Sequence, residues 1–416
     1  MTDSPSPITE PAWETLAPGL EVLLRPDTSN DIVALVVFRT LGSAIELQSD
    51  AGIVSLTQRM LQRGTRRLNQ AELAETIDSL GISLSCSAAD DYSNIHVITT
   101  SDTLSESIAL LSEIFFEPAF EPEEIEKERQ STLAAIRRSE DDLLSFTLKQ
   151  FFLQLYPDHG YGLPGAGLPE SVGELTRAQI INTHEELTAG PFKLIAVGNF
   201  EAAHLRQLLQ DKFATRMRPD TNESLIPAQP VAAPPVVTTL TRKSEQAYFV
   251  AGFPALPPTH PLYFAARVLN AVLGEGMSSR LFSTLREDKG LAYVTGSSYS
   301  TQKLAAQLFG YIGTKPESLE TAQTGMIQEF DRIKAELVPD EELTRARNYL
   351  AGKFLIDHQT NFRRAFYPGH FEMMGLGWQM DDHYASHILA VTPDQVRQAA
   401  NLILNDATIV QLVPKN

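Results

Sequence analysis

The chain of 416 residues repeats one order of predicted elements on the two sides of a proline-rich segment. Two anchors align the halves. Pro122-Glu123-Glu124, at the start of a predicted helix, matches Pro339-Asp340-Glu341-Glu342, and Gly81 matches Gly290. The two offsets differ, which indicates an insertion or deletion between the anchors. Two anchors in the same order predict a duplicated domain.

The proline-rich segment separates the two copies. Five prolines and little periodicity between Pro219 and Val237 are typical of a linker. We therefore expect an N-terminal domain at 1–217, a linker at 218–237 and a C-terminal domain at 238–416. Each half mixes strands with helices that follow one another, which favours an α+β fold over a doubly wound parallel sheet. The predicted architecture is two homologous α+β domains, each a mainly antiparallel sheet packed by helices.

The first strands of the N-terminal half predict a hairpin. Leu20–Arg25 and Ile32–Phe38 are short apolar or β-branched runs, and the turn cluster Pro26–Asn30 separates them. Elsewhere the periodicity predicts helices at 51–63, 69–80, 103–115, 123–138, 143–155, 176–187, 261–273 and 316–336, with strands at 82–87, 94–99, 192–197, 246–253, 292–298 and 305–312.

Charge, cysteine content and hydropathy exclude several classes of function. The net charge of −18 argues against a nucleic-acid partner, because no basic stripe is present. The single cysteine, Cys86, excludes an internal disulfide and a cysteine-based zinc site. No apolar run approaches the about 18 residues of a membrane span. Met1–Pro7 lacks the features of a signal peptide, so we expect a soluble protein with no membrane partner, in the cytoplasm by default.

The stretch from Gly274 to Tyr293 carries the most specific pattern. It predicts a turn, a helix, a glycine stop and a strand, with Gly290 as a left-handed C-cap. Arg286 falls in the last helical turn, and Tyr293 stands at the start of the strand. This arrangement can bring a guanidinium and a phenol to one place at the edge of a sheet.

This stretch resembles the second-half signature of the pitrilysin/insulinase family of zinc peptidases, and the resemblance covers nearly the whole chain. It implies paired homologous α+β domains. It also implies that Arg286 and Tyr293 donate hydrogen bonds to carbonyls of a peptide substrate, including the one that becomes an oxyanion. The residues alone favour a structural interpretation, in which Arg286 is a partner for its helix dipole and Tyr293 an ordinary strand aromatic. The match of the surrounding frame favours the functional one.

The zinc motif of the family, H-x-x-E-H, is degenerate here. The frame Ala51–Thr65 is recognisable, with Met-Leu-x-x-Gly-Thr at its end. Ser55 and Arg59 stand at the two histidine positions, and Gln58 stands at the glutamate position. The third ligand, a glutamate on a later helix, falls on Ala135. The resemblance therefore implies that this chain binds no zinc or other cofactor.

The chain has one pair of histidines at a spacing that could bind a metal. His383 and His387 lie one helical turn apart, a spacing that zinc permits. No third ligand is evident, and we favour polar residues of an amphipathic helix that buries Tyr384, Ile388 and Leu389.

Some members of the family divide their site between two chains, one with the zinc motif and one with the Arg/Tyr pair. This sequence resembles the second kind. We expect a non-zinc subunit of a heteromeric peptidase, inactive alone, whose homologous partner carries the zinc in a heterodimer or larger assembly; a homodimer in isolation remains open. The alternative is a catalytically dead scaffold or binding subunit, like the core subunits of the respiratory cytochrome complex. A third possibility, an independent peptidase with a relocated metal site, lacks a ligand set.

Overall fold

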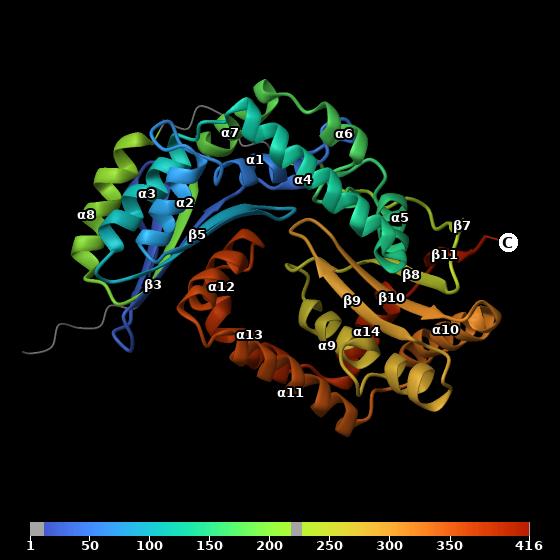
Figure 1. The fold of residues 1–416 in the computed structure, drawn as a ribbon. Helices are drawn as coiled ribbons and strands as arrows, with labels where there is room; N and C mark the ends of the chain where they lie inside the picture. Colours follow the sequence, from blue (N-terminus) through green and yellow to red (C-terminus); the bar gives the residue numbers. More distant parts are fainter. Residues whose placement is uncertain (1–11, 218–226, 416) are drawn as a thin grey trace, which may run out of the picture.

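The computed structural model describes residues 12–217 and 227–415. Residues 218–226 of the predicted linker lie outside this part of the chain. The described residues form two sheets, each covered by its own helices (Figure 1). No helix in these ranges combines the length and the apolar character that crossing a bilayer demands.

The N-terminal half contains a six-stranded sheet in the order β1-β2-β6-β3-β5-β4. Its β2–β6 pair is parallel, and its other pairs are antiparallel. The strands are β1 (Glu14–Ala17), β2 (Leu20–Pro26), β3 (Ile32–Arg39), β4 (Ser83–Ala88), β5 (Ser93–Thr100) and β6 (Phe192–Gly198).

The predicted hairpin of β2 and β3 is wrong, because β6 lies between these strands. Ile195 of β6 faces Leu23 on one side and Val36 on the other. β6 is an almost uninterrupted apolar run, and such a strand is typically central and buried on both faces. Strand predictions from local sequence could not see a partner that follows more than 150 residues later.

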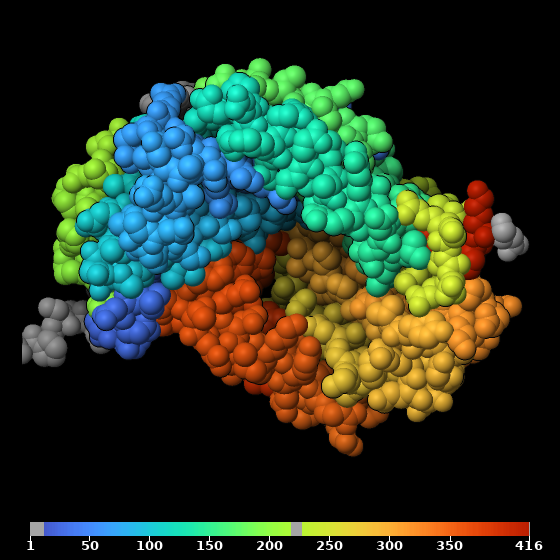
Figure 2. Space-filling view, viewed as in Figure 1, coloured from blue at the N-terminus to red at the C-terminus, as the bar shows by residue number. Residues whose placement is uncertain are grey.

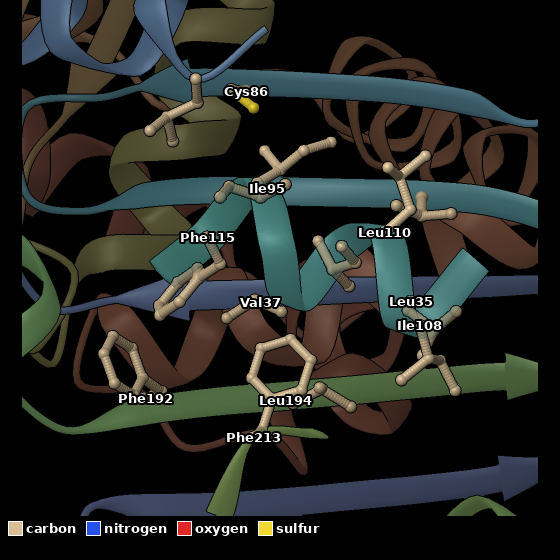
Figure 3. Packing of buried hydrophobic residues seen from close by; sticks show 14 of the residues in the cluster. Leu35, Val37, Cys86, Ile95, Ile108, Leu110, Phe115, Phe192, Leu194 and Phe213 are labelled. Atoms are coloured by element: carbon tan, nitrogen blue, oxygen red, sulfur yellow. The ribbon is translucent and has the colours of Figure 1, made fainter. Parts of the chain in front are cut away.

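The predicted helices of the N-terminal half are present, and two further helices, at 169–174 and 202–212, were not predicted. The helices of this half are α1 (Ile53–Met60), α2 (Gln70–Ser79), α3 (Leu104–Phe116), α4 (Pro122–Asp141), α5 (Leu143–Leu155), α6 (Pro169–Glu174), α7 (Arg177–Ala189) and α8 (Ala202–Lys212). Figure 3 shows the core that α3 forms with the sheet, where Phe115 lies beside Phe192 at a ring-centre distance of 4.8 Å. Leu35 and Val37 of β3 extend this apolar layer.

The C-terminal half repeats this plan with five strands in the order β7-β11-β8-β10-β9. The strands are β7 (Val237–Arg242), β8 (Ala247–Ala255), β9 (Val294–Thr301), β10 (Ala306–Thr314) and β11 (Thr408–Pro414). The helices are α9 (Tyr263–Gly274), α10 (Leu319–Ala335), α11 (Asp340–Asp357), α12 (Asn361–Met373), α13 (Met380–Leu389) and α14 (Pro393–Ile403), with a π-helix at Phe282–Asp288.

The topology confirms the duplication. Strands β2-β6-β3-β5-β4 correspond to β7-β11-β8-β10-β9, and the parallel pair stands at the same place in both sheets. The two anchor glycines also correspond. Gly81 has φ +63° and Gly290 has φ +60°, and each precedes the equivalent strand, β4 or β9. Each half is therefore an α+β domain with a mainly antiparallel sheet, as predicted.

The two halves exchange one helix. α5 packs on β8 and β11 of the second sheet, whereas α12 packs on β3 and β6 of the first (Figure 1). Glycines allow both contacts: a Cβ at Gly252 would lie 2.3 Å from the Phe151 ring, and one at Gly369 would lie 2.1 Å from the Phe38 ring. The exchange ties the halves into one unit.

The turns of two equivalent hairpins also meet. Asp90, between β4 and β5, accepts a hydrogen bond from Gln302 of the β9–β10 connection at 3.0 Å. The neighbouring Asp91 accepts one from the backbone N–H of Lys303 at 2.7 Å. Figure 2 shows the molecule as an arch, hollowed between the N-terminal half and the helices of the C-terminal half.

Candidate functional site

Three of the four positions predicted for the degenerate zinc motif lie on α1, whose start is fixed by a buried carboxylate. Glu46 accepts hydrogen bonds from the backbone N–H groups of Gly52 at 2.8 Å and Val54 at 2.9 Å. This contact satisfies N–H groups that a helix start leaves unpaired. Burial raises the pKa of Glu46 to about 8, although the two backbone donors act in the opposite direction.

The structure brings the four motif positions to adjoining helices. Ser55 and Arg59 lie one turn apart on α1, and Ala135 lies on α4, which packs against α1. Gln58 is completely buried, and neither polar atom of its amide has a hydrogen-bond partner. The placement of these positions on two neighbouring helices agrees with the arrangement that a metal site would need.

The chemistry at this place is that of an ion pair. Arg59 donates a hydrogen bond from Nη1 to Oε1 of Glu128 at 3.3 Å, and Arg63 donates from Nε to Oε2 at 2.9 Å. The side chain of Glu128 is only 3% exposed. One guanidinium from α1 and one from the turn that follows it thus share one buried carboxylate from α4. Sequence reasoning missed Glu128 and Arg63, although two arginines one helical turn apart are a signal for a shared acid.

These residues do not fit a zinc ion. A zinc site takes three or four thiolate, imidazole or carboxylate ligands. The four motif positions offer a hydroxyl, an amide, a guanidinium and a methyl group instead. A guanidinium has no lone pair to give and carries a permanent positive charge. Within residues 12–217 and 227–415, no three or more His, Cys, Asp or Glu side chains are grouped as a metal site.

The histidine pair on α13 makes aromatic contacts. His387 stacks on Phe264 at a ring-centre distance of 4.7 Å. Tyr384 and Ile388 are buried as predicted, but Leu389 is 46% exposed, so that part of the prediction is wrong. Tyr384 and Ile388 are four residues apart and share one helix face, whereas Leu389 lies about 100° further round.

The second-half stretch begins where α9 ends, at Gly274. Arg280 is 5% exposed and forms a two-pronged ion pair with Glu342 of α11, with both distances 2.8 Å. The following helix is a π-helix rather than the α-helix that the spacing predicted. Leu281 and Leu285 remain buried in the wider turns, and the N–H of Leu291 closes the end on the Leu285 carbonyl at 2.8 Å. Such π-helical turns are rare in proteins as a whole, but those that occur are often found at functional sites.

Arg286 and Tyr293 stand on either side of Gly290, beside the edge strand β9. The predicted left-handed conformation of Gly290 is confirmed. The Arg286 guanidinium lies 5.1 Å from the Phe282 ring centre and is exposed. Tyr293 is 49% exposed, and its backbone N–H donates to the Gly313 carbonyl at 2.9 Å. Both side chains therefore offer donors to solvent at one end of the sheet edge.

Two family models match the chain. The model described as insulinase (peptidase family M16) matches residues 21–157, and the model described as peptidase M16 inactive domain matches residues 174–350. The chain belongs to the M16 peptidase family. The Arg286–Tyr293 stretch lies within the half that matches the M16 inactive domain.

Similar proteins support the assignment to the M16 family. An uncharacterized zinc protease of Streptomyces coelicolor is 27% identical over 94% of this chain and 86% of its own length. The uncharacterized zinc protease YmxG of Bacillus subtilis is 24% identical over 95% of this chain and 96% of its own. A protease from Helicobacter pylori has the same fold, with a TM-score of 0.88 at 19% identity over 98% of this chain and 100% of the other. The chain is thus a homologue of M16 zinc proteases.

Proposed function

We propose that this chain is the zinc-lacking, substrate-binding subunit of a two-chain M16 peptidase. The observation that carries the proposal is the Arg59–Glu128 ion pair, which puts a guanidinium at a position that the zinc motif aligns with a ligand. Arg286 and Tyr293 meanwhile keep their polar groups exposed beside the edge strand β9. A homologous subunit with an intact motif would supply the zinc, and the zinc would activate the attacking water.

The part of this chain in the reaction is to bind and orient a peptide. The Arg286 guanidinium has five N–H donors, and the Tyr293 hydroxyl can donate one hydrogen bond. Donors aimed at a carbonyl oxygen hold the substrate and stabilise the negative charge that develops during hydrolysis. Removal of one such donor from an enzyme costs about 10²–10³ in rate. The exposure of both residues suits a role that is completed by a second chain.

A scaffold function is the second candidate. The observation in its favour is that Arg286 rests on Phe282 of its own π-helix, a contact that is itself worth about 0.5–1 kcal/mol at exposed sites. In a scaffold the guanidinium would stabilise the helix and contact no substrate. The two candidates differ in whether the chain changes the hydrolysis rate of its partner.

Reconstitution tests the proposal. Peptide hydrolysis is measured with this chain alone, with a homologue that carries the intact zinc motif, and with both together. The expected result is activity in the mixture well above the sum of the two separate chains, with none from this chain alone. Chelator-sensitive hydrolysis by this chain alone would overturn the proposal. A mixture no more active than the homologue, despite complex formation seen by light scattering, would favour the scaffold.

A further inference from the structure

A cavity of about 160 Å³ lies where the exchanged helix α12 meets the helices of the C-terminal half. Its walls come from α9, α11, α12 and α13, with Thr301 at the end of β9. In Figure 1 these helices lie on the lower side of the arch, and neither Arg286 nor Tyr293 lines the cavity. The cavity is therefore separate from the candidate site described above.

Aromatic rings form most of the apolar wall of this cavity. The rings belong to Tyr263, Phe354, Tyr367, Phe371 and Tyr384. They pack on one another, with Phe354 and Tyr384 at a ring-centre distance of 4.5 Å and Phe354 and Tyr367 at 5.1 Å. A wall of this kind favours a flat or branched apolar group.

Arg267 of α9 contributes a positive charge that has no carboxylate in direct contact with it among the described residues. The side chain is half-buried, its Nε has no hydrogen-bond partner, and its guanidinium is hydrogen-bonded to the Tyr384 side chain. In the described part of the chain it forms no salt bridge with a carboxylate, although the charge of Glu275 acts on it from further away. Lys353, the other cation of the wall, is paired with Glu275 at 3.0 Å. Asp357 accepts a hydrogen bond from the Tyr367 hydroxyl at 2.8 Å. A buried cation without a carboxylate is costly unless an anion or several dipoles complete it.

His370, which also lines the cavity, adds no positive charge to the wall at pH 7. Burial, and then the positive charge of Arg267, lower the pKa of His370 to about 4. The ring is therefore neutral at pH 7, and its Nδ1 lies 3.0 Å from the Tyr92 hydroxyl of the N-terminal half. The charge of Arg267 thus acts on groups inside the cavity.

The size of the cavity limits the ligand. A dry cavity of about 150 Å³ lined by apolar side chains is large enough for benzene. The present cavity therefore holds one ring-sized or branched apolar group, and a charged end beside it would meet Arg267. Guanidinium groups bind carboxylates with two parallel hydrogen bonds.

We propose that this cavity is a binding site for a carboxylate that bears one ring-sized apolar group. The carboxylate would contact Arg267, and the apolar group would lie among the rings of α11, α12 and α13. The ligand is either a small free acid or the C-terminal residue of a peptide, because both present the same chemistry. This site is independent of the proposed peptidase role, since it uses none of the residues assigned to that role.

Calorimetric titration of the full chain tests the site with N-acetylphenylalanine and with its amide, which lacks only the charge. Saturable binding of the acid is expected, about tenfold or more tighter than binding of the amide, as for the loss of a charge-assisted hydrogen bond. Arg267→Met should weaken binding of the acid to the same degree. Arg397→Met, an equal loss of charge on the exposed surface of α14, should leave it unchanged.

A second pair of ligands distinguishes the two sources of the carboxylate. A peptide that ends in phenylalanine is titrated with a free and with an amidated C-terminus, and tight binding of the free form alone identifies a peptide end. Binding of the small acid but of neither peptide identifies a free acid, and both results support the site. Equal binding of acid and amide, undiminished binding of the acid to Arg267→Met, or no saturable binding of either acid would overturn it. Arg267→Lys keeps the charge should the Met variant fail to fold.

Discussion

Arg59 of α1 donates a hydrogen bond across 3.3 Å to Glu128 of α4, from a position where the resemblance to the zinc motif predicts a histidine. Glu128 is almost fully buried and also binds Arg63. The Glu128 carboxylate therefore links α4 to α1 through an ion pair. This ion pair is one of the contacts that hold α1 and α4 together in the first half of the chain.

The ion pair predicts an effect of Glu128→Gln on stability. The variant leaves Arg59 and Arg63 without a carboxylate, and the expected loss is roughly 1–3 kcal/mol, because both arginines are partly exposed to water. Urea unfolding measures it. The matched control is Glu341→Gln, which breaks the exposed pair with Arg345 and should change stability by less than about 0.5 kcal/mol. Equal effects of the two substitutions would show that the buried pair contributes nothing special.

Zinc affinity should return when the ligand set returns. The variant carries Ser55→His, Gln58→Glu, Arg59→His and Ala135→Glu, on two helices that already contact each other. It should bind zinc and gain about 2.7 kcal/mol of stability at a zinc concentration 100 times the dissociation constant. The natural chain should show no such gain. A folded variant that binds no zinc would mean that α1 and α4 no longer have the spacing of a metal site.

The helix exchange predicts opposite effects for two helical glycines. Gly369→Ala on α12 places a methyl group 2.1 Å from the Phe38 ring, so it should destabilise the protein and loosen α12 from the first sheet. Gly352→Ala on α11 meets no atom within 4 Å and should stabilise by about 0.5–1 kcal/mol. Thermal unfolding compares them. A neutral or stabilising Gly369→Ala would contradict the close packing of α12 on β3.

His370 predicts a pH dependence. Its pKa in the folded protein is lowered from 6.5 to about 4, first by burial. The unfolded chain then binds a proton that the folded chain does not, so stability falls as the pH drops below about 6.5 and continues to fall until about 4. At pH 5 the expected share of this histidine is about 2 kcal/mol.

The substitution His370→Gln isolates this share, because glutamine does not titrate and can still meet the Tyr92 hydroxyl. Urea midpoints are measured at pH 7 and pH 5 for both proteins. The variant should lose less stability than the wild type over this interval. An identical loss in the two proteins would assign the acid sensitivity to other groups.

The sequence predicted the local elements well and the long-range pairings poorly. Gly81 and Gly290 marked helix ends because their positive φ angles suit glycine, and both predictions hold. The position of β6 between β2 and β3, and the exchange of α5 with α12, depend on contacts between residues far apart in the chain, which periodicity does not record. Strands β1, β7 and β11 were not predicted. Exposure alternates along β7 (Val237–Arg242), and the β-branched residues of this run are a sequence signal that could have identified it.

The candidate site was predicted unevenly for similar reasons. The helix-glycine-strand pattern predicted the order of Arg286, Gly290 and Tyr293 before a strand, and that strand, β9, lies at the edge of the sheet. The approach of the two side chains to each other and their contact with substrate stay predictions. The π-helix was not predicted, because the spacing of Leu281 and Leu285 does not distinguish it from an α-helix. Residues four apart lie on about the same face of either kind of helix. Glu128 was not predicted, and only the structure shows that it binds two arginines.

The divided site is tested most directly by hydrolysis in a complex with a zinc-motif homologue. Wild type is compared with the double variant Arg286→Ala/Tyr293→Phe at saturating partner, with complex formation verified by light scattering. The two donors predict a fall in kcat of about 10²-fold or more, with the complex intact. Unchanged kcat in an intact complex would contradict the account and leave the pair as structural residues of a scaffold.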